Sequence, residues 1–234
     1  MLAPIHIITQ IADCAEWADR LVRADLIKGF IVTENDYTSN FTSAFRREIN
    51  SRNIPEIAAH SQTLSPKVER STGTDGCIIF RNNNQFKIGL FEAKWPRFST
   101  HINYWDSLQK KTLSSHFDDQ LQRQHHLSDY AIWEMFYSEE PYGANPLFPT
   151  FGSSCIWHAD VFAASSSRSS TSTWTDAELK AILSASGKGI RDIVTAICSC
   201  THGKVYSTSV MHSLLEELGI KGEVLVVQLG ESHR

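Results

Sequence analysis

Two apolar segments rich in strand-forming residues, separated by a run of asparagines, limit most strongly what this chain can fold into. The first segment is Cys77-Ile78-Ile79-Phe80, the second runs from Phe86 to Phe91, and Asn82-Asn83-Asn84 lies between them. Aromatic and β-branched residues favour strands, and asparagine tolerates the left-handed conformations that tight two-residue turns require. The pattern therefore predicts a β-hairpin that turns at Asn83-Asn84.

The position of the turn fixes which residues of the two strands face each other. If Asn82 pairs with Gln85, extending the ladder residue by residue places Asp75 opposite Glu92. Lys94 shares the face of Glu92, because side chains two residues apart on a strand point the same way. Two carboxylates and an ammonium are therefore predicted to converge at the open end of the hairpin.

Such a cluster is typical of a metal site. Like charges directly opposite each other destabilise a sheet, and a cation between them relieves the repulsion. Oxygen-rich clusters suit Mg²⁺ or Mn²⁺. The alternative is that Asp75 caps a strand and that Glu92 and Lys94 are solvated residues on an edge strand. The apolar run before Glu92 favours a central strand, where charged side chains need a reason.

Asp75, followed by Glu92-Ala93-Lys94 at the end of the next strand, resembles the signature of the PD-(D/E)XK, or restriction-endonuclease-like, nuclease superfamily. Thr74 stands where the signature has proline. The resemblance covers roughly residues 30–137. It implies an α/β fold in which a central mixed sheet is flanked by helices and the core runs helix, three strands, helix, strand (αβββαβ). It also implies that the end of the hairpin hydrolyses phosphodiester bonds.

The residues before the hairpin predict the first core helix. Thr33-Glu34-Asn35-Asp36 has the pattern of a capping box. The apolar residues that follow recur at helical spacing: Tyr37, Phe41, Phe45 and Ile49. Many members of the superfamily carry a further Glu on this helix, so the resemblance implies that Glu34 completes the site. Alternatively, Glu34 is a favourable charge at the positive end of the helix dipole.

The residues after the hairpin predict a helix over residues 105–127 and a fourth core strand over residues 130–137. Gln120 and Gln124 share one face of that helix. Some branches of the superfamily carry a glutamine there, which implies that Gln120, or second to it Gln124, faces the metal site or the nucleic-acid backbone. Ordinary helix surface is the alternative for both.

The pattern is less informative in the flanking segments. A helix is predicted over residues 13–30, and residues 51–74 are interpreted as a connection that contains a weak strand candidate at Lys67-Val68-Glu69-Arg70. Residues 141–149 have the proline and glycine content of a loop, and a strand is predicted at 155–162.

The serine-rich stretch 165–173 marks a candidate boundary. We expect a nuclease-like core with an N-terminal helix in residues 1–163 and a mostly helical extension in 174–234. Three helices are predicted in the extension: one after the capping box at 175–178, one at 190–200 and one at 210–218. A buried strand at 223–229 follows, and we expect it to pack on the core sheet.

Composition narrows the protein class. The 234 residues contain no run of about 18 apolar residues, and the first residues lack the pattern of a signal peptide, so neither a membrane partner nor secretion is expected. Five scattered cysteines fit free thiols in a reducing cytoplasm. Cys198-x-Cys200-x-His202 supplies only three potential zinc ligands and lacks a second paired element.

The net charge of −4 argues against a protein that coats nucleic acid by bulk electrostatics. Individual basic side chains could still contact phosphates. We expect such contacts from four of them and from one glutamine: Arg97, Lys110, Lys111, Arg123 and Gln124.

The resemblance leads to one expected function. Asp75, Glu92, the carbonyl of Ala93 and Glu34 would hold one or two Mg²⁺ or Mn²⁺ ions. Lys94 would orient or deprotonate the attacking water or pair with the phosphate, and the substrate would be DNA. Cutting both strands of a duplex would favour a symmetric dimer.

Two alternatives stay open at this stage. The same site could cut RNA, since aromatic residues after the motif could stack on unpaired bases: Trp95, Phe98, Tyr104 and Trp105. Those residues could equally belong to the core, which we favour. The other alternative is a nuclease-like fold that binds nucleic acid or a protein without cutting.

Overall fold

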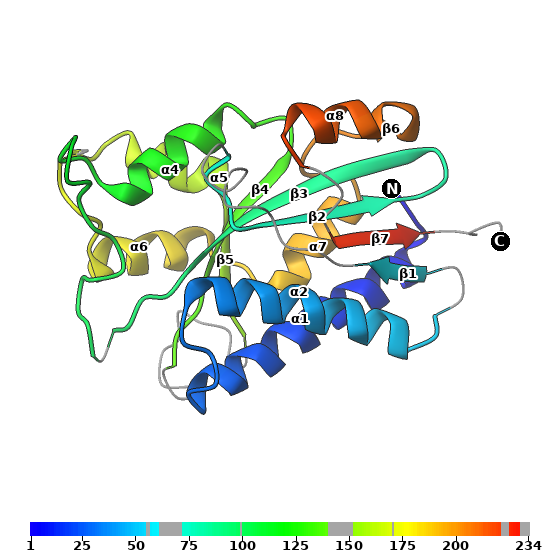
Figure 1. Ribbon diagram of the computed structural model, residues 1–234, viewed down its shortest axis with the longest axis horizontal. Coiled ribbons are helices and arrows are strands. Elements are labelled where there is room, and N and C mark those ends of the chain that lie inside the picture. The colour runs from blue at the N-terminus through cyan, green and yellow to red at the C-terminus, as the bar shows by residue number, and fades with distance from the viewer. Residues whose placement is uncertain are drawn as a thin grey trace.

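The computed structural model describes residues 1–54, 57–60, 72–98, 100–139, 152–169, 171–220 and 225–229 (Figure 1). Within these residues, seven strands form one mixed sheet that is flanked by helices on both faces. The chain is therefore an α/β protein, as the sequence predicts. None of the helices in this described part combines the length and hydrophobicity needed to span a membrane.

The sheet has the strand order β1-β7-β2-β3-β4-β5, and the two-residue β6 pairs with the start of β3. The strands are β1 Ile57–His60, β2 Gly76–Arg81, β3 Gln85–Lys94, β4 Ala131–Phe136, β5 Ser154–Trp157, β6 Tyr206–Ser207 and β7 Leu225–Leu229. β7 runs parallel to β2, and β4 runs parallel to β3, whereas the other pairs are antiparallel. β3 thus lies between two partners near the centre of the sheet.

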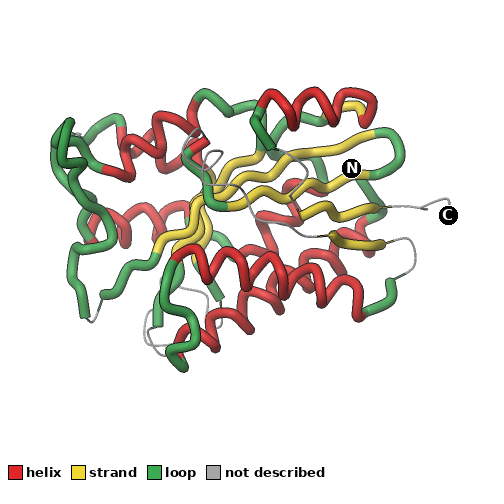
Figure 2. The backbone as a smooth tube through the Cα atoms, in the orientation of Figure 1, coloured by secondary structure: helices red, strands yellow, loops and turns green. Residues whose placement is uncertain are grey.

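Helices cover both faces of the sheet (Figures 1 and 2). They are α1 Ile5–Ile27, α2 Glu34–Ser51, α4 His116–His125, α5 His158–Ser165, α6 Asp176–Ser186, α7 Ile190–Cys198 and α8 Met211–Glu217. α1, α2 and α7 share one large apolar cluster with the first face of the sheet. On the second face, α8 covers one apolar cluster and α4, α5 and α6 cover another.

The β2–β3 hairpin has the predicted register. Gly76 pairs with Phe91, and the Asn82 amide donates to the Gln85 carbonyl at 2.8 Å. The Asn82 side chain closes the turn, because its Oδ1 accepts the backbone N–H groups of Asn84 and Gln85 at 2.9 and 2.8 Å. Every residue of β3 after Gln85 is buried. The edge-strand alternative for Glu92 and Lys94 is therefore wrong.

α2 begins as predicted. Thr33 is its N-cap and accepts the Asp36 N–H, and the Asp36 carboxylate accepts the Thr33 N–H in return. The predicted apolar stripe is fully buried: Tyr37, Phe41, Phe45 and Ile49. The preceding helix is also present, but α1 begins at Ile5 rather than at residue 13.

The helix predicted over residues 105–127 is only partly correct, because α4 covers no more than His116–His125. The Asp106 carboxylate holds the segment before α4 in a loop instead of a helix. It accepts the Ser115 hydroxyl at 2.7 Å and the backbone N–H groups of Phe117 and Trp174 at 3.0 and 2.9 Å. Ser115 in turn caps α4 by accepting the Asp118 N–H. These contacts favour a loop over a longer helix.

Four further predictions need correction or lie outside the described residues. The strand predicted at 155–162 is short, since β5 ends at Trp157 and α5 begins at His158. The connection predicted at 51–74 contains the strand β1. The candidate strand at 67–70 and the loop at 141–149 lie outside the described residues.

The C-terminal predictions are largely confirmed. α6 begins at a capping box formed by Thr175 and Glu178, and α7 and α8 lie within the predicted ranges. β7 inserts into the sheet between β1 and β2, so the C-terminal segment packs on the core sheet as expected. The serine-rich stretch begins where α5 ends and leads into α6.

Candidate active site at the open end of the central hairpin

Asp75 lies directly before β2 and faces the end of β3. Its backbone N–H donates to the Phe91 carbonyl at 2.8 Å, which extends the hairpin by one residue. Its carboxylate Oδ2 accepts the Ala93 N–H at 2.8 Å. The predicted register therefore places the Asp75 carboxylate beside the Glu92-Ala93 peptide, and it holds that peptide in place.

Glu92 and Lys94 form a buried ion pair on one face of β3. The Lys94 ammonium is 2.6 Å from Glu92 Oε1, and the two residues are 8% and 2% exposed. The Gln120 side-chain amide donates to the same Glu92 oxygen from α4. Gln120 thus faces the site, as predicted.

Glu34 reaches the site from the first turn of α2. Its Oε1 accepts the Trp95 N–H at 3.0 Å, and its Oε2 is 4.0 Å from the Lys94 ammonium. Glu34 also lies in the first turn of α2, so its position agrees with the helix-dipole alternative as well. The structure therefore brings Asp75, Glu92, Lys94, Glu34 and Gln120 together, although they come from distant parts of the chain.

Burial and charge determine the protonation of the site. Burial raises the pKa of Glu92 well above its usual range; Lys94 opposes this shift, and the nearby Asp75 and Glu134 add to it. Burial alone would lower the pKa of Lys94, but the carboxylates of Glu92, Glu34 and Asp75 outweigh it and raise that pKa. Lys94 therefore keeps its proton here, which disfavours it as the base that deprotonates a water molecule.

Sequence analysis missed a second buried carboxylate. Glu134 on β4 pairs in register with Glu92 on β3, and because the strands are parallel the two side chains lie on the same face. Glu134 is fully buried, and neither of its oxygens has a hydrogen-bond partner among the described residues. The sequence did contain a signal for it, because Glu134 is a charged residue between Trp133 and Met135 in an otherwise apolar strand.

His158 is the nearest basic group to Glu134. Its Nδ1 is 3.6 Å from Glu134 Oε1, too long for a hydrogen bond, and both ring nitrogens lack a hydrogen-bond partner among the described residues. His158 is 4% exposed and lines a small cavity of about 130 Å³ beside the start of β4. The buried polar strip thus extends from Lys94 through Glu92 and Glu134 to His158.

The donor set of the site has the chemistry that a hard divalent cation prefers, because it consists of carboxylate oxygens with an excess of negative charge. The carboxylates are nevertheless engaged with Ala93, Lys94, Gln120 and Trp95. No group of three or more His, Cys, Asp or Glu side chains in the described ranges is arranged to hold a metal ion. Ligation by Asp75, Glu92, Ala93 and Glu34 stays a prediction.

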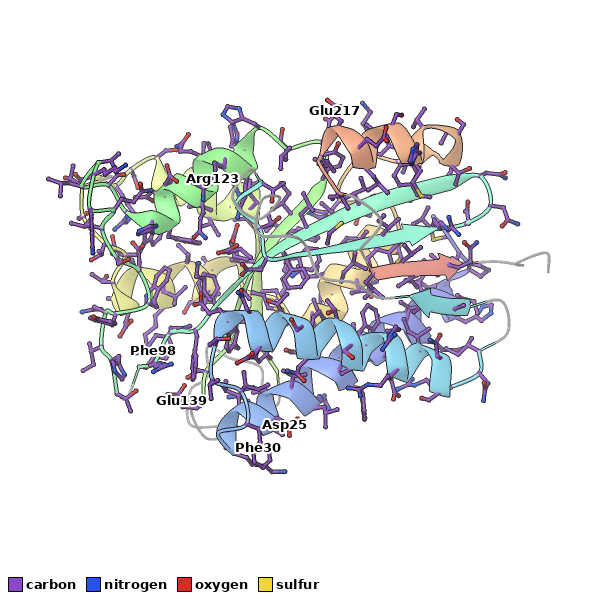
Figure 3. All side chains as sticks on the ribbon, viewed as in Figure 1. Asp25, Phe30, Phe98, Arg123, Glu139 and Glu217 are labelled. Carbon is purple, nitrogen blue, oxygen red and sulfur yellow. The ribbon has the colours of Figure 1, made fainter. Side chains whose placement is uncertain are left out.

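The basic side chains predicted to contact phosphates differ in their exposure and in their partners. Lys110 and Lys111 are exposed in the loop before α4. Arg123 forms an ion pair with Asp119 on α4 and lies on that helix in Figure 3. Arg97 stacks over the ring of Trp95 at 3.7 Å. These four side chains remain candidates for contact with nucleic acid.

The prediction for Gln124 is wrong. Its side chain is fully buried, and its amide donates to the Gly73 carbonyl at 2.6 Å. A buried side chain cannot contact a nucleic-acid backbone from solvent. Gln124 instead ties α4 to the segment that leads into Asp75, so it positions the site.

The aromatic residues after the motif are divided between core and surface. Phe98 is buried and Trp105 packs on Phe117 and Phe136, as expected for core residues. Tyr104 is 76% exposed, so assigning it to the core was wrong. Tyr104 and Trp95 instead line a pocket of about 320 Å³ beside Glu34.

The five cysteines are distributed over α1, β2, β5 and the end of α7 with the turn that follows it. All five lie in the described residues and none is in a disulfide. Cys198 is buried, and Cys200 takes a left-handed backbone conformation that turns the chain away from α7.

No protein family matches this chain, and no curated protein and no solved structure is significantly similar to it. The site must therefore be interpreted from its own geometry and chemistry.

Proposed function

We propose that this protein is a metal-dependent endonuclease that hydrolyses phosphodiester bonds of DNA with a PD-(D/E)XK-like site. The observation that carries the proposal is the convergence of Asp75, Glu92 and Lys94, with Glu34, at one end of the central hairpin. Burying charged residues costs free energy, so a cluster of them at a buried strand end favours a functional role. The turn at Asn83-Asn84 predicts the hairpin register, and in that register Asp75 lies beside the peptide between Glu92 and Ala93.

The order of elements supports a restriction-endonuclease-like core. Among the described residues, the elements α2, β1, β2, β3, α4 and β4 come in the order helix, three strands, helix, strand, which is the order that the resemblance implies. β7, inserted between β1 and β2, and the helices α6 to α8 are additions to such a core.

Asp75, Glu92, the Ala93 carbonyl and Glu34 would hold one or two Mg²⁺ or Mn²⁺ ions. A divalent ion bound there would lower the pKa of a bound water and offset charge on the phosphate. The fit rests on charge, since three carboxylates lie around one ammonium: Glu34, Asp75 and Glu92 around Lys94. Such an excess of negative charge favours a bound cation.

Lys94 and Gln120 would contact the scissile phosphate or the attacking water. Because Lys94 keeps its proton, its ammonium would donate a hydrogen bond to the scissile phosphate or to the attacking water. Gln120 donates to Glu92 with its amide nitrogen, and its Oε1 is buried without a hydrogen-bond partner among the described residues. That oxygen would accept a hydrogen bond from a water molecule bound at the site.

A cleavage and binding experiment tests the proposal. Purified protein is incubated with duplex DNA, single-stranded DNA and RNA in Mg²⁺, Mn²⁺ or EDTA, beside the variant Asp75→Asn. Binding of Mn²⁺ is followed separately by electron paramagnetic resonance. We expect DNA cleavage that needs the metal, and we expect Asp75→Asn to weaken Mn²⁺ binding and to abolish cleavage.

Asp129→Asn is the matched control, because Asp129 is an exposed aspartate paired with Lys204 outside the site. It should leave cleavage and Mn²⁺ binding unchanged. Cleavage that persists in Asp75→Asn, or cleavage in EDTA, would refute the site. Cleavage of RNA alone would replace DNA as the substrate, and binding without metal-dependent cleavage would indicate a non-catalytic protein.

A further inference from the structure

The pocket beside Glu34 adjoins the candidate active site, because Glu34 belongs to both. Glu34 forms part of its wall, and the same carboxylate accepts the Trp95 N–H and lies 4.0 Å from the Lys94 ammonium. Trp95 is the residue directly after Lys94 and also lines the pocket. A ligand in this pocket would therefore lie next to whatever the site carboxylates and Lys94 bind.

The pocket wall combines aromatic faces with a cation. Tyr104 presents a largely exposed ring, and the His101 ring lies 5.9 Å from it. The Arg97 guanidinium stacks on Trp95 at 3.7 Å, and no ion pair joins it to a carboxylate in the described part of the chain. Aromatic rings bind the flat face of a nucleobase, and an arginine held by stacking can bind the adjoining phosphate.

Two acidic groups lie near the pocket. Glu34 is at the end that faces the active site. The Glu139 carboxylate accepts the Trp95 indole N–H at 2.6 Å. Glu34 thus carries negative charge at the end of the pocket nearest the candidate active site, and Arg97 supplies a positive charge on its wall.

The pocket is small and its loop is fixed in place. A volume of about 320 Å³ is at the lower end for ligand sites, roughly 300–1,000 Å³, and suits one nucleotide rather than a base pair. The Asn103 N–H donates to the Asp176 carboxylate at 3.0 Å, and the Asp176 N–H donates to the Asn103 side-chain oxygen at 2.6 Å. These two bonds anchor the loop that contains Tyr104 to the start of α6. A loop fixed before binding loses less entropy when a ligand arrives.

We infer that this pocket binds one unpaired nucleotide of the substrate strand, beside the phosphate that is cut. A base inside a duplex is stacked and paired on both sides, so it cannot enter unless it is extruded. The preferred substrate is then a single strand, a flap or a frayed end rather than an intact duplex. The position relative to the cut rests on the proposed nuclease function, whereas binding of the unpaired nucleotide does not.

Binding in EDTA tests the inference without cleavage. Short oligonucleotides that carry the fluorescent base 2-aminopurine are titrated as single-stranded DNA, single-stranded RNA and blunt duplex DNA. We expect quenching on single strands and at least tenfold tighter binding than to the duplex. Tyr104→Ala should weaken single-strand binding roughly tenfold, the loss expected for one stacked base, and Tyr104→Phe should retain it.

Trp17→Ala is the control, because Trp17 is a partly exposed aromatic residue of α1 that does not line the pocket. It should bind like the wild type. Tyr104 is so exposed that its replacement should leave the fold intact, which circular dichroism checks. Equal binding of single strand and duplex, or unchanged single-strand affinity in Tyr104→Ala, overturns the inference.

The two proposals can fail separately. Tyr104-dependent binding of single strands without any cleavage would support the pocket and refute the nuclease. Metal-dependent cleavage of intact duplex that Tyr104→Ala leaves unchanged would support the nuclease and refute the pocket. The DNA and RNA titrations decide which sugar the bound strand carries.

Discussion

Replacing Lys94 with methionine removes the ammonium from the candidate site while keeping much of the side-chain volume. The ammonium lies 2.6 Å from Glu92 Oε1, and Glu92 is only 2% exposed. Removing one partner of a buried ion pair lowers stability by about 3–5 kcal/mol when the remaining charge stays uncompensated. Burial raises the pKa of Glu92, so Glu92 can take up a proton once Lys94 is gone. We therefore expect the free energy of unfolding of Lys94→Met to fall by less, about 1–3 kcal/mol at neutral pH, the cost of a buried polar group that has lost its partner.

Urea unfolding in EDTA, followed by circular dichroism, measures this loss. Glu92→Gln and the double variant complete a cycle that isolates the interaction between the two residues. The double variant should be more stable than Lys94→Met, because it no longer buries a carboxyl group that has lost its charged partner. Mn²⁺ should restore part of the stability of Lys94→Met, since a ligand that binds only the folded state stabilises it.

Lys204→Met provides the matched control, because Lys204 forms an exposed ion pair with Asp129. Exposed pairs contribute about 0–1 kcal/mol, so this variant should unfold almost like the wild type. A loss below about 0.5 kcal/mol in Lys94→Met, within the range of surface substitutions, would refute the reasoning. A double variant as unstable as Lys94→Met would also refute it, because the loss would then not come from the carboxyl group of Glu92.

Three further outcomes are expected. Glu134→Leu should raise the free energy of unfolding by about 1–3 kcal/mol in urea melts, because it replaces a buried polar side chain that has no hydrogen-bond partner among the described residues with an apolar one; a loss of stability would contradict this. Gly76→Ala should lower the melting temperature by crowding the core at a cost of about 1–3 kcal/mol, since an added Cβ would lie 2.2 Å from the Phe91 ring; an unchanged melting temperature would contradict it. Burial tends to raise the pKa of Glu178, but hydrogen bonds from Arg168 and Thr175 lower it from 4.5 to about 2. Its stabilisation should therefore be present above pH 4.5 and lost towards pH 2. Because Glu178 is 39% exposed, Glu178→Gln should cost only about 1 kcal/mol at pH 7 in urea melts, and this difference should vanish at the acid end.

The sequence predicts the hairpin well because its register depends on local chemistry. The Asn82 side chain closes the turn with residues two and three positions away, so the ladder up to Asp75 and Glu92 follows from a short segment. The same holds for α2 and α6, whose capping boxes lie within four residues. Local patterns were sufficient wherever the stabilising contacts were local.

The errors occurred where distant contacts decide the structure. Helical spacing extends from residue 105, but Asp106 accepts a hydrogen bond from Trp174, which no local pattern shows. Spacing also placed Gln120 and Gln124 on one face of α4, yet it could not show that Gln124 is buried against Gly73. Glu134 was missed as a partner of Glu92 because the register of two parallel strands depends on the connection between them rather than on a turn.

The polar strip lies where the second face of the sheet lacks a continuous apolar layer. One cluster beneath α8 and another beneath α4, α5 and α6 are separate, whereas the first face carries a single large cluster. Glu92 and Glu134 occupy adjacent strands at the same level. Their burial opposes folding, and the continuous core on the opposite face supplies stability that does not depend on the charged residues. A fold built in this way can keep an unfavourable cluster of carboxylates, and a cation bound there should increase its stability.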